Sequence, residues 1–142
     1  MAPISMDDLP QEIRGPSAWY GPDLAARGDW IEQLTELEIL EIDAAAERLA
    51  NAEIDIPSIR KHDFPLPMLG PRLRRMLEHV LTGRGFVLLR RLPVERWSRR
   101  KTATAYFGLG AHLGSARSQN AQGHVLGHVK DLGFSSSDPN VR

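Results

Sequence analysis

Two histidines four residues apart, His124 and His128, have the spacing in this sequence that comes nearest to a metal site. On a helix they would share a face, and both imidazoles could reach one ion at about 2.0–2.1 Å. On a strand they would lie about 13 Å apart, too far for one ion. Residues 123–131 contain two glycines and two valines and follow a helix stop, which favours a strand. We therefore expect hydrogen-bonded sheet residues rather than metal ligands.

No other group in the sequence completes a catalytic or metal-binding pattern. His62 lies in a proline-rich loop beside Asp63. His79 lies outside the apolar face of its predicted helix, and His112 lies near the end of another predicted helix. The chain has no cysteine, which excludes disulfides, thiolate catalysis and cysteine zinc sites. It contains no His-x-Asp, His-x-Glu, HExxH, P-loop or GxSxG motif. The residues alone therefore predict no catalytic group and no metal ligand.

The first of three predicted helices begins at Thr35, where Glu38 completes a capping box. Its apolar residues form two stripes, which predicts a helix wedged between neighbours rather than lying on a surface. The wider stripe is Ile39, Ile42, Ala46, Leu49 and Ala50, and the narrower one is Leu37, Leu40 and Ala44.

The second predicted helix begins at Pro71 and ends at Gly83, and the third runs from a Ser98 cap to about Leu113. Gly108 and Gly110 weaken the third helix and suggest close approach to another backbone. The predicted apolar faces are Leu73, Met76, Leu77, Val80 and Leu81 in the second helix, and Thr102, Ala105, Tyr106, Leu109 and Leu113 in the third.

Strands are predicted at three places. The run Phe86–Leu89 is apolar throughout, which suits a strand covered on both faces. A short edge strand is expected at Ile54–Ile56, and another strand at Gly123–Asp131. Residues 1–30 read as an irregular arm, with a turn of helix near 22–27, that aromatic residues pin onto the core. This order of helices and strands predicts an α+β fold.

The zero net charge conceals two oppositely charged halves. Residues 1–56 carry 13 acidic and 3 basic side chains, whereas residues 57–142 carry 5 acidic and 15 basic ones. A basic half can indicate an anionic partner. It can also mean that the two halves lie against each other, which we favour because the acidic half would compete with a nucleic acid. We therefore expect no nucleic-acid partner, although a basic-patch binder remains an alternative.

Length and composition indicate a soluble protein. The 142 residues have room for one domain or for part of a larger one, and 42% apolar and 25% charged residues are ordinary values. The opening "MAPISMDDLPQEIRGP" carries acids where a signal peptide needs basic and apolar segments. No apolar run approaches the roughly 18 residues of a membrane span. We expect a cytoplasmic location and no membrane partner.

Three stretches together resemble a known family. They are "AWYGPDLAARGDWIEQLTELEILEIDAAAERL", "GRGFVLLRRLPVERWSRRKTATAYFGLGAHLG" and "SQNAQGHVLGHVKDLG". They resemble the N-terminal part of TauD/TfdA-like (clavaminate synthase-like) Fe(II)- and 2-oxoglutarate-dependent dioxygenases, over about Pro16 to Arg142. The resemblance implies the N-terminal part of a double-stranded β-helix, or jelly roll. Residues 1–142 would form one partial domain, with 1–30 as the arm, 31–142 as the helical and first-strand portion, and the barrel incomplete.

In that family a His-x-Asp/Glu pair and a distal histidine hold Fe(II), and a later arginine steadies 2-oxoglutarate. The resemblance implies that these groups follow the stretch present here. Neither cofactor is therefore expected to bind this chain alone. It also implies that Gln119 and Asn120 line the substrate pocket, although Asn120 could equally be an ordinary turn residue.

The resulting hypothesis is an N-terminal fragment, or truncated product, of such an oxygenase, inactive alone and derived from a parent that acts on a small organic substrate. The alternative is a non-catalytic module that associates with a second chain carrying the metal site. In both cases the apolar strand leaves an open sheet edge, which a second chain or another copy would cover.

Overall fold

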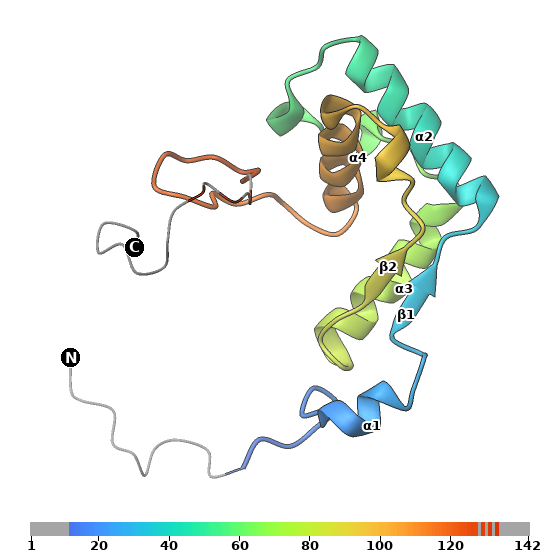
Figure 1. Cartoon of the computed structure of the whole chain (residues 1–142), viewed down its shortest axis with the longest axis vertical. Coiled ribbons are helices and arrows are strands. Elements are labelled where there is room, and N and C mark those ends of the chain that lie inside the picture. Colours follow the sequence, from blue (N-terminus) through green and yellow to red (C-terminus); the bar gives the residue numbers. More distant parts are fainter. Residues whose placement is uncertain (1–11, 128, 130, 132, 134–142) are drawn as a thin grey trace.

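Helices and two short strands alternate along the chain in the computed structural model, which describes residues 12–127, 129, 131 and 133 (Figure 1). Both element types that the sequence predicts are therefore present, and the jelly roll stays a prediction. No helix in this described part is long and apolar enough to cross a membrane. The elements are α1 (Gly21–Ala25), β1 (Ile31–Gln33), α2 (Glu36–Asn51), α3 (Leu69–Thr82), β2 (Leu88–Arg90) and α4 (Arg99–Ala111), with 3₁₀ turns at Ile56–Ser58, Lys61–Asp63 and Val94–Arg96.

The strands β1 and β2 form a parallel pair whose connection runs through α2 and α3. The register places Ile31 beside Leu88. At the two ends of the ladder, the Leu88 N–H donates to the Trp30 carbonyl at 2.9 Å and the Leu34 N–H donates to the Arg90 carbonyl at 3.2 Å. The sequence predicted the second strand two residues early, and it missed the first.

The capping box that starts α2 is confirmed. The Glu38 N–H donates to Thr35 Oγ1 at 3.2 Å, and the Thr35 N–H donates to Glu38 Oε2 at 2.8 Å. In the wider apolar stripe Ile42, Ala46 and Leu49 are buried, with Ile42 completely inaccessible, and Ile39 and Ala50 are half-buried. The prediction of cover on both sides is wrong for the described residues, because Leu37 and Leu40 are 59% and 62% exposed.

Helix α3 begins at Leu69, two residues before the predicted Pro71. A proline is tolerated in the first turn because the N–H groups there have no partner inside the helix. The Glu41 carboxylate of α2 provides the cap, accepting the Met68 N–H at 2.8 Å and the Leu69 N–H at 2.9 Å. Gly83 ends the helix as predicted. The start of α3 is thus set by Glu41 of α2 and not by the local proline on which the prediction rests.

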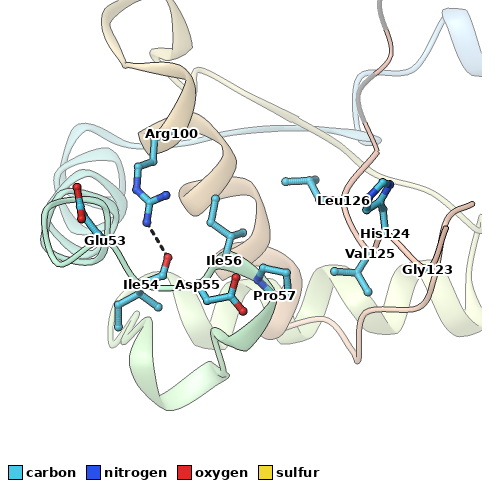
Figure 2. A pocket seen from close by; sticks show the side chains of 10 residues that line it. All are labelled: Glu53, Ile54, Asp55, Ile56, Pro57, Arg100, Gly123, His124, Val125 and Leu126. Atoms are coloured by element: carbon cyan, nitrogen blue, oxygen red, sulfur yellow. Dashed lines mark hydrogen bonds between the residues drawn. The ribbon is translucent and has the colours of Figure 1, made fainter.

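The predicted edge strand at Ile54–Ile56 is wrong. The chain turns there instead, and a 3₁₀ turn covers Ile56–Ser58, because Pro57 fixes its φ and has no N–H for a ladder. The Ser58 N–H closes the turn on the Asp55 carbonyl at 2.9 Å. Figure 2 shows this turn beside the Arg100 guanidinium, which bonds to the Ile54 carbonyl.

Helix α4 has the predicted Ser98 cap, with the Lys101 N–H donating to Ser98 Oγ at 3.2 Å, but it ends at Ala111 rather than at Leu113. The predicted apolar face is partly wrong, because Tyr106 is 68% exposed and Leu113 is 41% exposed. The residues that α4 buries are Thr104, Ala105, Phe107, Gly108 and Leu109. The buried face of α4 differs from the predicted one because the helix packs through Gly108 against Phe64.

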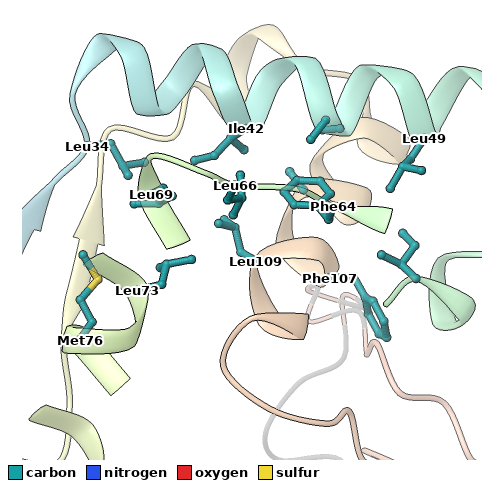
Figure 3. Close-up of a cluster of buried hydrophobic side chains, with 14 residues drawn as sticks. Leu34, Ile42, Leu49, Phe64, Leu66, Leu69, Leu73, Met76, Phe107 and Leu109 are labelled. Atoms are coloured by element: carbon teal, nitrogen blue, oxygen red, sulfur yellow. The ribbon is translucent and has the colours of Figure 1, made fainter. Parts of the chain in front are cut away.

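The core lies between α2, α3 and α4, and the phenyl ring of Phe64 is at its centre (Figure 3). Phe64 comes from the proline-rich loop before α3 and is completely buried. Gly108 of α4 packs against this ring. The buried apolar side chains are Leu34, Ile42, Ala45, Ala46, Leu49, Ile59, Phe64, Leu66, Leu69, Leu73, Met76, Ala105, Phe107 and Leu109.

Only one face of the sheet is covered by the described residues. Val87 and Leu89 pack against the core, whereas Leu88 is 38% exposed on the other face. The described residues thus cover one face, and cover of the second face stays a prediction. The arm meets the strand end, as predicted from its aromatic residues, with the Trp19 and Phe86 ring centroids 5.4 Å apart.

Ion pairs join the acidic and basic halves of the chain. Arg72 of α3 contacts Glu32 at 2.5 Å and Glu38 at 2.7 Å, and Lys101 of α4 contacts Asp43 at 2.9 Å. Burial raises the pKa of the Glu38 carboxyl, but hydrogen bonds from Thr35 and Arg72 outweigh burial and leave that pKa below its ordinary value. The prediction that the two halves lie against each other is confirmed.

Candidate functional site: a groove beside the 118–126 loop

A groove of about 580 Å³ lies between the segment that follows α2 and the loop that follows α4 (Figure 2). This volume is within the roughly 300–1,000 Å³ range of small-molecule sites. Most of the lining is apolar, with a histidine on one wall and two carboxylates on the other. The lining residues are Glu53, Ile54, Asp55, Ile56, Pro57, Arg100, Gly123, His124, Val125 and Leu126.

The first wall is held in place by Arg100 at the start of α4. Its Nη2 donates to the Ile54 carbonyl at 2.7 Å, and its Nε donates to the Ala50 carbonyl at 3.3 Å. Glu53 makes the bend after α2 with φ at 51°, in the left-handed region. Because Arg100 already bonds to two backbone carbonyls, its guanidinium acts mainly as a structural clamp of this wall.

The second wall is a tight loop closed by backbone bonds. The Gly123 N–H donates to the Asn120 carbonyl at 3.0 Å, and the Gln119 N–H donates to the His124 carbonyl at 2.7 Å. Gly123 has φ at 82°, which a glycine adopts without strain. Residues 123–127 are irregular, with a bend at Val125 and Leu126, so the strand predicted over these residues is wrong. His128 lies outside the described residues.

Asn120 is bonded to His124 through both atoms of its amide. Its Oδ1 accepts the His124 backbone N–H at 3.0 Å, and its Nδ2 lies 2.9 Å from the ring atom His124 Nδ1. Gln119 donates from Nε2 to the Arg117 carbonyl at 2.9 Å. Gln119 and Asn120 stand next to the groove but are not among its lining residues. Their predicted role in a substrate pocket stays a prediction.

Sequence reasoning missed the groove itself. The contact of Arg100 with residues about 50 positions earlier has no local signal. A signal for the loop existed, since an Asn three residues before a Gly is typical of a turn. A turn predicted from that signal would have argued against a strand and placed Asn120 near His124.

The other histidines are structural or exposed. His112 Nε2 lies 2.7 Å from the Phe64 carbonyl, His62 Nε2 lies 3.3 Å from Asp63 Oδ1 in the same turn, and His79 is exposed on α3. Within residues 12–127, together with 129, 131 and 133, no three His, Asp or Glu side chains come together in a way that could hold a metal ion. The described residues therefore do not fit an iron site.

Two curated proteins are similar to this chain over most of its length, whereas no family model matches it. Taurine hydroxylase-like protein SAT17 of Stachybotrys chartarum is 27% identical over 124 residues, covering 87% of this chain and 32% of that protein. FR-33289 synthase of Streptomyces rubellomurinus is 26% identical over 125 residues, covering 88% and 37%. The chain thus spans about a third of the length of the curated relatives that it matches. The first name agrees with the TauD-like resemblance of the sequence motifs.

Proposed function

We propose that this chain is the N-terminal scaffold of a TauD/TfdA-like Fe(II)- and 2-oxoglutarate-dependent oxygenase that acts on a small organic substrate. The observation that carries the proposal is the similarity along 87% of the chain to a protein named as taurine hydroxylase-like. A second relative aligns over nearly the same share of the chain. The stretches that resemble the family include β2, α4 and the 118–126 loop, so the similarity reaches the groove.

The metal-binding groups of this oxygenase are proposed to lie outside the chain. The described histidines and carboxylates do not come together as a ligand set, and the matched relatives are about three times as long as the matched region. No step through iron follows from the residues present. What they contribute is a wall of the substrate site, with Arg100 clamping one side and the 118–126 loop forming the other.

A second candidate function is a non-catalytic module that pairs with a separate chain. The geometry of the sheet favours it as an alternative. In a parallel ladder, alternate residues point their backbone groups to opposite edges. Leu88 and Arg90 face β1, so Val87 and Leu89 point their N–H and C=O groups away from it. Among the described residues no hydrogen-bond partner occupies these groups on the outer edge of β2.

Within the described residues the outer edge of β1, unlike that of β2, is hydrogen-bonded to other groups of the chain. On the outer edge of β1 the Gln33 carbonyl accepts Arg72 Nη2 at 2.9 Å, and the Ile31 N–H donates to the Gly28 carbonyl at 3.1 Å. That edge is thus occupied by the chain's own groups. The β2 edge offers a place for an added strand, from the rest of the same protein or from a second chain.

The experiment compares Fe(II) binding and 2-oxoglutarate turnover in two proteins. One is the purified 142-residue chain. The other is a longer protein in which the chain is followed by the residues encoded immediately downstream of it. Anaerobic titration calorimetry should show stoichiometric Fe(II) binding for the extended protein and none for the chain. Assays with taurine as the first substrate then measure succinate. Succinate formed by the 142-residue chain alone would contradict the proposal that the metal-binding groups lie outside it. An extended protein that binds no iron would contradict the assignment as an oxygenase.

A further inference from the structure

The hydrogen bonds of Asn120 determine which way its amide points. A backbone N–H can only donate, so the atom that faces the His124 N–H at 3.0 Å must be the oxygen Oδ1. The amide nitrogen Nδ2 is then the atom that lies 2.9 Å from His124 Nδ1. An amide NH₂ donates and has no acceptor capacity. The ring atom Nδ1 must therefore accept.

An accepting Nδ1 determines the tautomer of the histidine. In a neutral imidazole one nitrogen carries the proton and the other accepts, so the proton of His124 resides on Nε2. No described side chain or backbone group bonds to this Nε2. His124 is one of the side chains that line the groove (Figure 2). His124 is an exposed residue, so the loop offers an imidazole N–H donor at the rim of a groove whose lining is mostly apolar.

We propose that Asn120 is a positioning residue that holds His124 in its Nε2–H form, and that this N–H binds the carbonyl oxygen of a small uncharged ligand in the groove. The apolar side chains of Ile54, Ile56 and Leu126 receive the rest of such a molecule. Under this assignment Asn120 acts through His124 and does not touch the ligand.

The charges around the groove favour an uncharged acceptor over an anion. The carboxylates of Glu53 and Asp55 belong to the opposite wall and form no ion pair among the described residues. The one guanidinium of the groove, that of Arg100, donates to backbone carbonyls. The two carboxylates outnumber this single guanidinium, so a ligand carboxylate would meet a net negative charge in the lining, whereas a ketone or ester oxygen would accept from His124 without repulsion.

The tautomer assigned to His124 does not depend on the chain being part of an oxygenase. The inference that the ligand is the substrate of an enzyme does rest on the proposed function. The two parts therefore have separate readouts. Ring ¹⁵N chemical shifts report the tautomer in the 142-residue chain itself, and ligand titration reports the groove. Neither measurement requires iron or turnover, so loss of the proposed function leaves both results interpretable.

The first experiment is an NMR measurement of the His124 ring at pH 8.5, where an ordinary imidazole is neutral. The wild-type chain should show the proton on Nε2. Asn120→Asp keeps an oxygen for the His124 N–H but replaces the Nδ2 donor by an acceptor, so the proton should move to Nδ1. Gln119→Glu makes the same chemical change one residue earlier and should leave the proton on Nε2. A wild-type ring protonated on Nδ1, or an Asn120→Asp ring unchanged from the wild type, would overturn the assignment.

The second experiment titrates 2-hexanone into the ¹⁵N-labelled chain, with hexanoate as the anionic counterpart. We expect saturable shifts at Val125, Leu126 and the His124 ring with 2-hexanone, and weaker binding of hexanoate. In Asn120→Asp, binding of 2-hexanone should weaken about 3- to 10-fold, the range for loss of one neutral hydrogen bond. Unchanged spectra outside residues 117–126 verify that the variant folds. No saturable shift with 2-hexanone, equal affinity in Asn120→Asp, or tighter binding of hexanoate would refute the ligand class.

Discussion

Gly108 of α4 lies so close to Phe64 that no side chain fits between them. A Cβ atom at position 108 would be 2.3 Å from Cδ2 and 2.4 Å from Cγ of the phenyl ring. Real Cβ atoms do not approach carbon atoms this closely. The ring is completely buried and cannot turn outward into solvent. The glycine is therefore what allows α4 and the proline-rich loop to share the core.

Gly108→Ala should destabilise the chain. The added methyl group must displace a buried ring, and such overpacking costs about 1–3 kcal/mol, which exceeds the roughly 1 kcal/mol gained by replacing a helical glycine. Gly110→Ala is the matched control, because a Cβ there has no atom within 4 Å, and it should stabilise by up to about 1 kcal/mol. Urea denaturation measures both. A Gly108→Ala midpoint at or above that of the wild type would contradict the packing.

Replacing Glu41 should weaken the start of α3. Its carboxylate accepts the Met68 and Leu69 N–H groups from a different helix. Glu41→Ala removes both acceptors and should cost about 1 kcal/mol, as for other N-terminal caps. Glu41→Gln keeps one amide oxygen and should lose less. Denaturation midpoints rank the three proteins, and an unchanged midpoint for Glu41→Ala would show that water replaces the carboxylate without cost.

Stability should fall in acid through Asp29. Hydrogen bonds from Arg27 and Arg84 lower the pKa of Asp29 from its ordinary value of 3.8 to about 2. A lowered folded-state pKa stabilises the folded chain above the unfolded value, and the contribution disappears as pH falls from about 4 towards 2. Asp29→Asn should therefore reduce the denaturation midpoint at pH 6, with a difference from the wild type that shrinks towards pH 2. Asp23→Asn, which removes a carboxylate that forms no ion pair among the described residues, is the control. A difference that does not depend on pH would exclude this linkage.

Local signals in the sequence predicted the helices because the bonds that define them are local. The Thr35 capping box and the Ser98 cap each involve residues three positions apart. Strand β1 had no such signal, since three residues are too few for a pattern and its pairing partner Leu88 is more than 50 positions away. The start of α3 was misplaced for the same reason, because its cap comes from Glu41 on another helix.

The faces of the helices were harder to predict than their limits. The periodic pattern placed Tyr106 inside, but Tyr106 is exposed. The close approach predicted for Gly108 is present, although the partner is the Phe64 side chain rather than a backbone, and Gly110 has no such neighbour among the described residues. Apolar spacing likewise suggested that Leu37 and Leu40 are covered, and they are exposed among the described residues. At the candidate site the sequence pointed to Gln119 and Asn120, and their role stays a prediction, whereas the contact of Asn120 with His124 could be recognised only from the loop geometry. The jelly roll and the iron stay predictions.

Adjacent amides of β2 should differ in hydrogen exchange, because the strand has one paired and one open edge. The Leu88 N–H donates to the Trp30 carbonyl at 2.9 Å, whereas the Leu89 N–H points away from β1 and has no acceptor in the described part of the chain. In NMR exchange experiments Leu88 should therefore exchange at least about ten-fold more slowly than Leu89, since only Leu88 requires the sheet to open. Equal protection of both amides would mean that something covers the edge. Sedimentation equilibrium then separates a second copy, which gives a dimer, from a segment of the same chain, which leaves a monomer. In a longer protein or with a partner chain, a strand added at β2 should slow Leu89 selectively and leave Leu88 nearly unchanged.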